Sequence, residues 1–202
     1  MANVTRPFGF RPVKHLTGAP YNGQANIYEI GVSDAAATFI GDLVKASDEA
    51  ATDFYPTAER YAASGEVTSG LILGAIVGFV IPVSASSSQP SLDTPVYRAA
   101  STKRFALVAD SPDLIFEVED GATVATPIAS LGLNTGVQCT AGSTTTGLSN
   151  MTTGATAATT TNSLPLQIMG FVNAPNNETA AAYQRILVKI NQHQYMGGQT
   201  AV

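Results

Sequence analysis

The chain has 202 residues, of which 45% are hydrophobic and only 12% are charged, with a net charge of −5 at pH 7. Such a hydrophobic content excludes a disordered chain, and the length suits one domain of ordinary size or two small ones. The negative charge argues against bulk attraction to nucleic acid or to an anionic membrane. With 18 Gly and 11 Pro, the composition favours many strands joined by turns over a helical bundle.

The cysteine content and the apolar runs indicate where the protein is made. Cys139 is the only cysteine, so an internal disulfide is impossible, and we expect this thiol to be an inert small hydrophobe. The sequence shows no signal peptide, and the apolar run Leu71–Val83 is shorter than the about 20 residues that span a bilayer. We therefore expect a soluble chain synthesised in the cytoplasm.

Residues 1–24 have the composition of an extended N-terminal arm, because their prolines and glycines disfavour both helix and sheet. Three basic residues and no acidic one precede Glu29. Phe8 and Phe10 lie among them, and a mobile tail has little reason to carry such apolar side chains. We expect the arm to dock on its own body or on a neighbour; the alternative is a solvated terminus.

The first half of the body contains three strand patterns. Residues 26–30 and 38–45 are β-type runs, the second divided by a turn at Gly41-Asp42. In residues 69–83 every second residue is apolar, and the opposite face carries Gly70, Gly74 and Gly78. This pattern predicts a strand buried on one side, with glycines that let another backbone approach closely. The alternative, a membrane helix-pairing motif, is disfavoured by the short length and by Pro82.

The middle of the chain predicts a hairpin. Residues 84–91 form a low-complexity loop, and the strands 103–108 and 114–118 follow, separated by the turn sequence Asp-Ser-Pro-Asp. In the second strand Leu114, Phe116 and Val118 face the core, and Ile115, Glu117 and Glu119 face outward.

The C-terminal half combines a polar stretch with two strands. Residues 134–163 are poor in large apolar side chains, which predicts a long loop or strands packed against another subunit. Residues 165–171 and 185–192 are the final strands, with a possible short helix at 178–183 and a loose tail at 196–202. The fold class expected is mostly β: a β-barrel or sandwich body over residues 25–195 with at most one or two short helices.

Residues with catalytic or metal-binding chemistry are scarce. His15 and His193 lack any motif around them, and both are expected to be exposed. Asp110, Asp113 and Asp120 lack the spacing of a calcium loop and are better explained as turn carboxylates. Glu117 and Glu119 share one strand face, so they cannot flank a substrate. The sequence predicts a non-enzymatic protein with no metal and no cofactor.

Five segments of the chain resemble a family of tailed-bacteriophage structural proteins, the capsid decoration or cement proteins. They are RPFGFRPVKHLTGAPYNGQ, IGDLVK, LILGAIVGF, ASTKRFALVADSPDLIFEVED and ETAAAYQRILVKINQHQY, which are spread along the chain from Arg6 to Tyr195. The resemblance implies β-barrel-like bodies bound at symmetry positions on the outer surface of an HK97-like capsid shell. Such proteins stabilise the shell by clamping neighbouring capsomers.

The resemblance also implies partners and a location. The partners would be the major capsid protein and further copies of this chain, with a homotrimer favoured over a homodimer, and neither nucleic acid nor membrane. The location would be the virion, after synthesis in the host cytoplasm. We expect the arm to bind its partner through Arg6, Phe8, Phe10 and Arg11, since Arg and Phe are typical interface anchors. Two alternatives remain: a tail or head–tail connector component, and a carbohydrate-binding accessory domain.

Overall fold

The computed structural model describes residues 3–51, 54–80, 93–121, 126–179 and 181–196. The described chain forms three antiparallel sheets, and its one helical element is a 3-10 turn, η1 (Ile128–Ser130). The expected mostly β fold is therefore confirmed, and over these residues none of the sheets closes into a complete barrel. No helix in the described part of the chain is long and apolar enough to cross a membrane.

We call the three sheets the first, second and small sheets. In spatial order, the first sheet holds β1 (Arg11–His15), β8 (Leu114–Glu119), β13 (Arg185–Ile190), β12 (Leu166–Phe171) and β9 (Asn134–Thr135). The second sheet holds β2 (Asn26–Ile30), β7 (Arg104–Ala109), β6 (Gly74–Phe79), β3 (Leu43–Ala46) and β4 (Ala58–Arg60). The small sheet holds β11 (Thr152–Thr153), β10 (Val137–Cys139) and β5 (Gly65–Val67).

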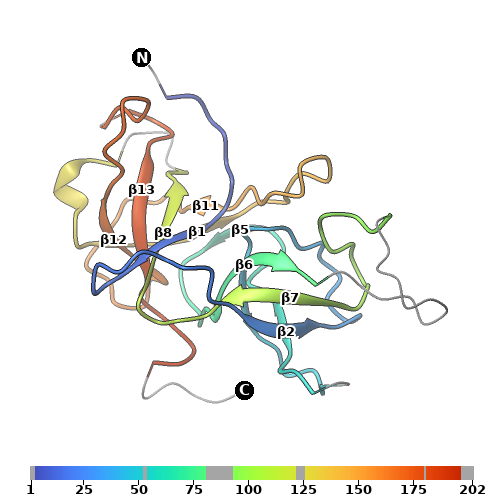
Figure 1. The fold of residues 1–202 in the computed structure, drawn as a ribbon. Coiled ribbons are helices and arrows are strands. Elements are labelled where there is room, and N and C mark those ends of the chain that lie inside the picture. The colour runs from blue at the N-terminus through green and yellow to red at the C-terminus, as the bar shows by residue number, and fades with distance from the viewer. Residues whose placement is uncertain (1–2, 52–53, 81–92, 122–125, 180, 197–202) are drawn as a thin grey trace.

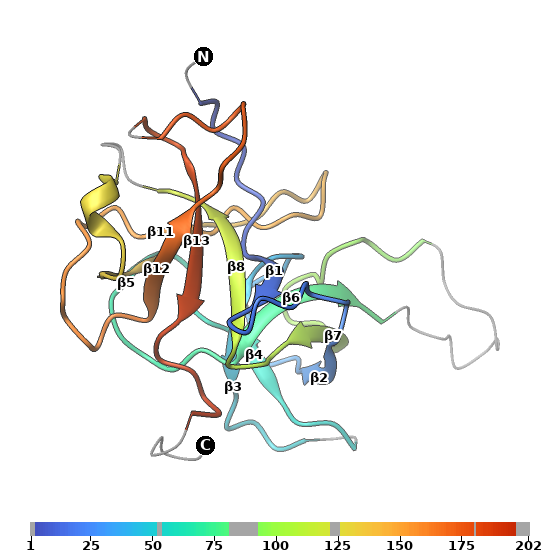
Figure 2. The same ribbon diagram turned by 60° about the vertical axis from the view of Figure 1, so that its left-hand side comes forward.

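The first and second sheets lie side by side (Figures 1 and 2). The second sheet curls, and Glu29 of its edge strand β2 forms an isolated parallel bridge with Thr57, which precedes the opposite edge strand β4. Its interior holds one apolar cluster that includes Tyr28, Val44 and Ile76. The larger cluster draws residues from all three sheets, so burial of apolar surface holds the sheets together.

The predicted hairpin at residues 103–118 is wrong, although both strands exist. β7 pairs with β2 and β6 in the second sheet, whereas β8 pairs with β1 and β13 in the first. The intervening turn is therefore a corner that carries the chain from one sheet to the other (Figure 1). A turn sequence specifies a reversal of direction and does not specify which strands pair.

The expected one-sided burial of residues 69–83 is also wrong. β6 begins only at Gly74, and Leu73, Ala75 and Ile76 are all fully buried. Both faces are covered because Ala75 packs in the larger cluster while Ile76 packs inside the curled second sheet. The predicted close approach is confirmed at Gly74, where an added Cβ would lie 2.3 Å from the Ala109 carbonyl oxygen. The expected loop at 84–91 lies outside the described residues.

The Thr- and Gly-rich residues 134–163 are not a bare loop. They contribute β9, β10 and β11, and they place Val137, Cys139 and Met151 in the larger cluster of this chain. Cys139 is buried, and burial raises the pKa of its thiol to about 11, which keeps the thiol protonated.

The two final strands are confirmed. β12 and β13 pair antiparallel, and Ile186, Val188 and Ile190 are buried while the residues between them are half-buried. The short helix expected at residues 178–183 is wrong: residues 178, 179 and 181–183 are not helical, and Tyr183 has a left-handed φ of 58°. The side chain of Asn177 closes this loop instead, bonding backbone groups of Val172 and Arg185. Of the expected tail at 196–202, residues 197–202 lie outside the described residues.

Candidate functional site: a groove beneath the N-terminal segment

The N-terminal segment, residues 3–16, lies on the body of its own chain. β1 pairs with β8 at the edge of the first sheet. Just before β1, the backbone of Gly9 crosses that of Gly41 so closely that an added Cβ would lie 2.4 Å from the Gly41 carbonyl oxygen. Both glycines have left-handed φ values, of 72° and 92°. The crossing therefore requires glycine for space and for conformation.

The structure separates the four residues predicted to bind a partner. Phe10 is 1% exposed and belongs to the larger core cluster, and its N–H donates to the Gly41 carbonyl oxygen at 2.8 Å. It is therefore a core residue of this chain and is not accessible to a partner. Phe8 is half-buried, and Arg6 and Arg11 are exposed.

The segment before Phe8 is tied to the first sheet by Glu119. Its carboxylate accepts hydrogen bonds from the Thr5 hydroxyl at 2.9 Å and from the Arg6 backbone N–H at 2.7 Å. Glu119 was expected to face solvent on the outer side of β8, but it is buried because the N-terminal segment covers it. Burial raises the pKa of this carboxyl, although the two hydrogen bonds oppose the shift.

A second tie holds the start of the segment against the loop between β12 and β13. The Asn3 side-chain amide donates to the carbonyl oxygens of Glu178 and Ala182, and its oxygen accepts from the Glu178 N–H at 2.8 Å. The segment and this loop thus form two walls with the outer face of β8 between them.

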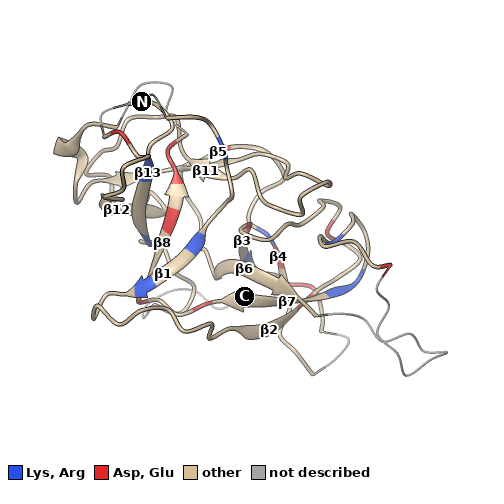
Figure 3. Ribbon diagram, turned by 45° about the horizontal axis from the view of Figure 1, so that its top comes forward, with Lys and Arg blue, Asp and Glu red and all other residues tan. Residues whose placement is uncertain are grey.

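The space between the walls is a groove of about 530 Å³, which we call the arm groove. This volume lies within the range of ligand-binding clefts. Its lining residues come from the N-terminal segment (Asn3, Val4, Arg6, Phe8 and Arg11), from β8 (Glu117 and Glu119) and from the opposite wall (Pro175, Asn176, Asn177, Tyr183 and Arg185). Figure 3 shows the arrangement of charge: the basic positions of β1 and β13 lie on either side of the acidic positions of β8.

The three arginines of the arm groove differ in their partners. Arg185 pairs with Glu117 at 3.0 Å and donates to the Asn176 side chain at 2.7 Å. The Arg11 guanidinium stacks over the ring of Phe8, 4.7 Å from its centroid. Neither Arg6 nor Arg11 has a side-chain hydrogen bond or an ion pair to any described residue, and the other four arginines of the chain each have one.

The sequence identified one wall of the arm groove and missed the other. Arg6, Phe8 and Arg11 were found from the basic, aromatic composition of the N-terminus. Asn176 lies in the loop before β13 and Arg185 begins that strand, about 170 residues later, and no local pattern marks them as neighbours of the N-terminus. Only the pairing of both β1 and β13 with β8 brings them together.

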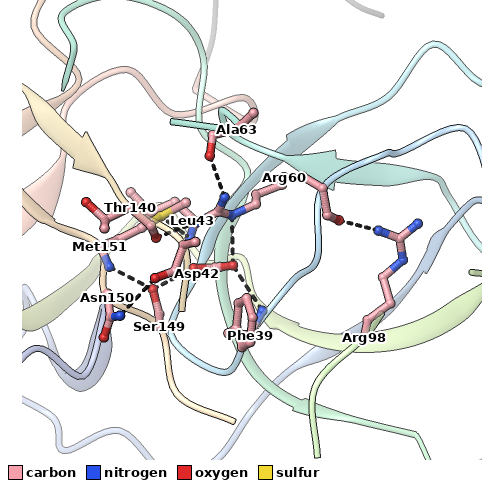
Figure 4. A network of polar contacts seen from close by, with 12 residues as sticks. Phe39, Asp42, Leu43, Arg60, Ala63, Arg98, Thr140, Ser149, Asn150 and Met151 are labelled. Carbon is pink, nitrogen blue, oxygen red and sulfur yellow. Dashed lines mark hydrogen bonds and ion pairs between the residues drawn. The ribbon is translucent and has the colours of Figure 1, made fainter. Parts of the chain in front are cut away.

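A buried polar network elsewhere has a structural role (Figure 4). Asp42 accepts hydrogen bonds from the Ser149 hydroxyl at 2.5 Å and from the Arg60 Nε–H at 2.9 Å. Arg60 also donates to the carbonyl oxygens of Ala63 and Thr140. Burial raises the pKa of Asp42, and Arg60 and these hydrogen bonds oppose the shift. These bonds join β3 and β4 to the segment around Ser149. Because the side chains of Asp42 and Ser149 are fully buried, a substrate could not reach them.

The expectation that His193 is exposed is wrong. It is fully buried beyond the end of β13, where it forms a bridge with Ile72 and its Nδ1 accepts the Tyr195 N–H at 3.0 Å. Nearby, Asp110 accepts a hydrogen bond of 2.6 Å from the Tyr28 hydroxyl, so this turn carboxylate bonds a side chain of β2. His15, by contrast, is half-buried at the end of β1.

We expect the buried His193 to make the protein less stable in acid. Burial lowers the pKa of His193 from 6.5 to about 4, with Asp110 and Asp113 opposing and Lys189 adding to the shift. Between these pH values the unfolded chain binds a proton that the folded chain does not. The contribution of His193 to the free energy of unfolding is therefore fully present above pH 6.5. It is lost as the pH falls toward 4, and the loss is at most roughly 3 kcal/mol.

Urea unfolding across this pH range measures the effect. In His193→Gln the part of the pH dependence that arises from this residue should disappear, and in the control His15→Gln it should persist. An unchanged pH dependence in His193→Gln would contradict the assignment.

The described residues contain no group of three His, Cys, Asp or Glu side chains able to hold a metal ion. No protein-family model matches the chain, and comparison with curated proteins and with solved structures gives no match.

Proposed function

We propose that this chain is a non-enzymatic virion structural protein that decorates the outer surface of an HK97-like capsid shell and clamps neighbouring capsomers. The resemblance of five of its segments to phage cement proteins supports this proposal. The observation that carries it is the pair Arg6 and Arg11, whose guanidinium groups have no acceptor among the described residues although the other arginines of the chain do. Both line the arm groove, as expected of side chains that meet a partner.

In this proposal the N-terminal segment is a fixed part of the binding surface. Glu119, Asn3 and the β1–β8 pairing hold its backbone before any partner arrives, so binding would not have to order it. The partner is the major capsid protein. The chain itself would form a trimer, or alternatively a dimer, and several weak contacts on a rigid shell would then act together.

The docked segment changes how the proposal should be tested. Deleting residues 1–24 would remove β1 and Phe10 from the body, so the loss of binding could reflect unfolding alone. Substitutions at exposed positions of the arm groove avoid this problem.

Cryo-electron microscopy of particles that carry the protein tests the proposal. We expect regular density for this chain on the outside of the shell, repeated at symmetry positions, with the arm groove facing a capsid subunit. Density confined to the tail or to the portal vertex would refute the decoration role and would favour the tail or connector alternative.

A further inference from the structure

We infer that the arm groove binds an acidic, extended segment of its protein partner, whose carboxylates pair with Arg6 and Arg11 while a neighbouring apolar side chain packs beside Phe8. This inference rests on the proposed function and names the chemistry of the partner at the same site. It is argued from the charge of the groove, from its apolar wall and from the fixed position of its arginines.

The charge of the arm groove is opposite to that of the whole protein. Its lining has three arginines against two glutamates, so it is net positive, on a chain whose net charge is −5. One of these arginines, Arg185, is already paired with Glu117. Arg6 and Arg11 are left for a partner, and the planar guanidinium of arginine matches a carboxylate with two parallel hydrogen bonds.

The floor of the arm groove distinguishes an acidic peptide from nucleic acid. Glu117 and Glu119 lie between the arginines. A nucleic-acid strand carries a phosphate at every nucleotide, so its backbone would meet like charge in the middle of the groove. A peptide can place its carboxylates at the two arginines and a neutral residue over the glutamates. This arrangement leaves a protein segment as the favoured occupant.

Apolar side chains form part of the wall beside the arginines. Phe8 is half-buried, Val4 is 66% exposed and Tyr183 is 39% exposed, and all three line the groove. A bound segment that covers these side chains would gain binding free energy from the hydrophobic effect. This gain matters because an ion pair between exposed charges contributes little by itself. An acidic segment that also carries apolar residues therefore fits better than a purely acidic one.

An NMR titration with synthetic peptides tests the inference. The probe is acetyl-Glu-Leu-Glu-Leu-Glu-amide, and the comparison peptide has Gln in place of each Glu. We expect the acidic peptide, at low salt, to shift the amide signals of residues 3–11 and 175–185, and the Gln peptide to shift them far less. The double variant Arg6→Gln/Arg11→Gln should bind the acidic peptide at least about five-fold more weakly. A matched control, Lys45→Gln/Lys189→Gln, removes the same charge outside the groove and should bind as the wild type does.

Several outcomes would overturn the inference. Equal binding of the two peptides would show that charge does not select the ligand, and equal loss in both double variants would show a general effect of net charge. If single-stranded DNA shifted the amide signals of the groove residues and the acidic peptide did not, the groove would be assigned to nucleic acid. If the same signals shifted as the protein concentration rose with no ligand added, the groove would be assigned to a second copy of the chain.

The titration is independent of where the protein is found on the particle. Density on the shell without peptide binding would refute only this inference. Peptide binding by a protein found at the tail would refute only the decoration role.

Discussion

Replacing Arg98 by methionine should cost about 3–5 kcal/mol of folding free energy, the largest effect we expect from a single polar substitution. The Arg98 side chain is fully buried between residues 31–38 and 95–102. Its guanidinium donates to four carbonyl oxygens, those of Gly31, Asp34, Ala36 and Thr102, and it lies 3.5 Å from the Asp34 carboxylate. Methionine fills a similar volume but cannot donate to the carbonyl oxygens of Gly31, Ala36 and Thr102, whereas the Asp34 carbonyl oxygen keeps the Ser101 N–H as a donor. The loss is a large part of the 5–15 kcal/mol that is typical of a whole domain.

Urea unfolding measures this loss, with Arg6→Met as the matched control. Arg6 is exposed and its side chain bonds no described residue, so the same chemical change there should alter stability by less than about 0.5 kcal/mol. If Arg98→Met were as stable as the control, the buried guanidinium would not be what holds the two loops together.

Phe10→Ala should destabilise the protein by about 3–5 kcal/mol, whereas Phe8→Ala should cost far less. Phe10 is buried in the larger core cluster, where its removal leaves a cavity beside β1. Phe8 is half-buried at the groove and contacts the Arg11 guanidinium, so its loss mainly removes a surface cation–π contact worth about 0.5–1 kcal/mol.

Thermal unfolding and peptide titration of both variants separate these two roles. We expect Phe10→Ala to unfold at a markedly lower temperature, and Phe8→Ala to keep its stability while binding the acidic peptide more weakly. Equal loss of stability in the two variants would contradict the placement of Phe10 in the core and of Phe8 at the surface.

Local patterns predicted the strands well and their partners poorly. Strands were predicted at residues 26–30 and 185–192, where β2 and β13 lie, because the composition and alternation of one strand depend only on that strand. The pairing of β8 with β1 and β13 joins residues about 70–105 positions apart, which no local pattern reports. The hairpin prediction failed for this reason, since it assumed that strands adjacent in the sequence pair with each other.

The same limit explains what was found and missed at the arm groove. Phe8 and Phe10 are two residues apart, so in a regular extended segment both would face the same side. Gly9 lies between them with a φ of 72°, which breaks the alternation and directs Phe10 into the core. Glycine permits this conformation without requiring it, so the sequence could not show that the two rings have different surroundings.

The position of β8 between β1 and β13 in the first sheet has a consequence for biosynthesis. Its two neighbours are the first and last strands of the chain, so β1 has to wait for β8, and the sheet is complete only when residue 190 has been made. The second sheet, by contrast, has all its strands by residue 109. We expect the second sheet to form while the ribosome is still translating and the first sheet to form only at the end, because distant pairings fold slowly. The arm groove, built on the first sheet, would thus be the last part of the molecule to mature.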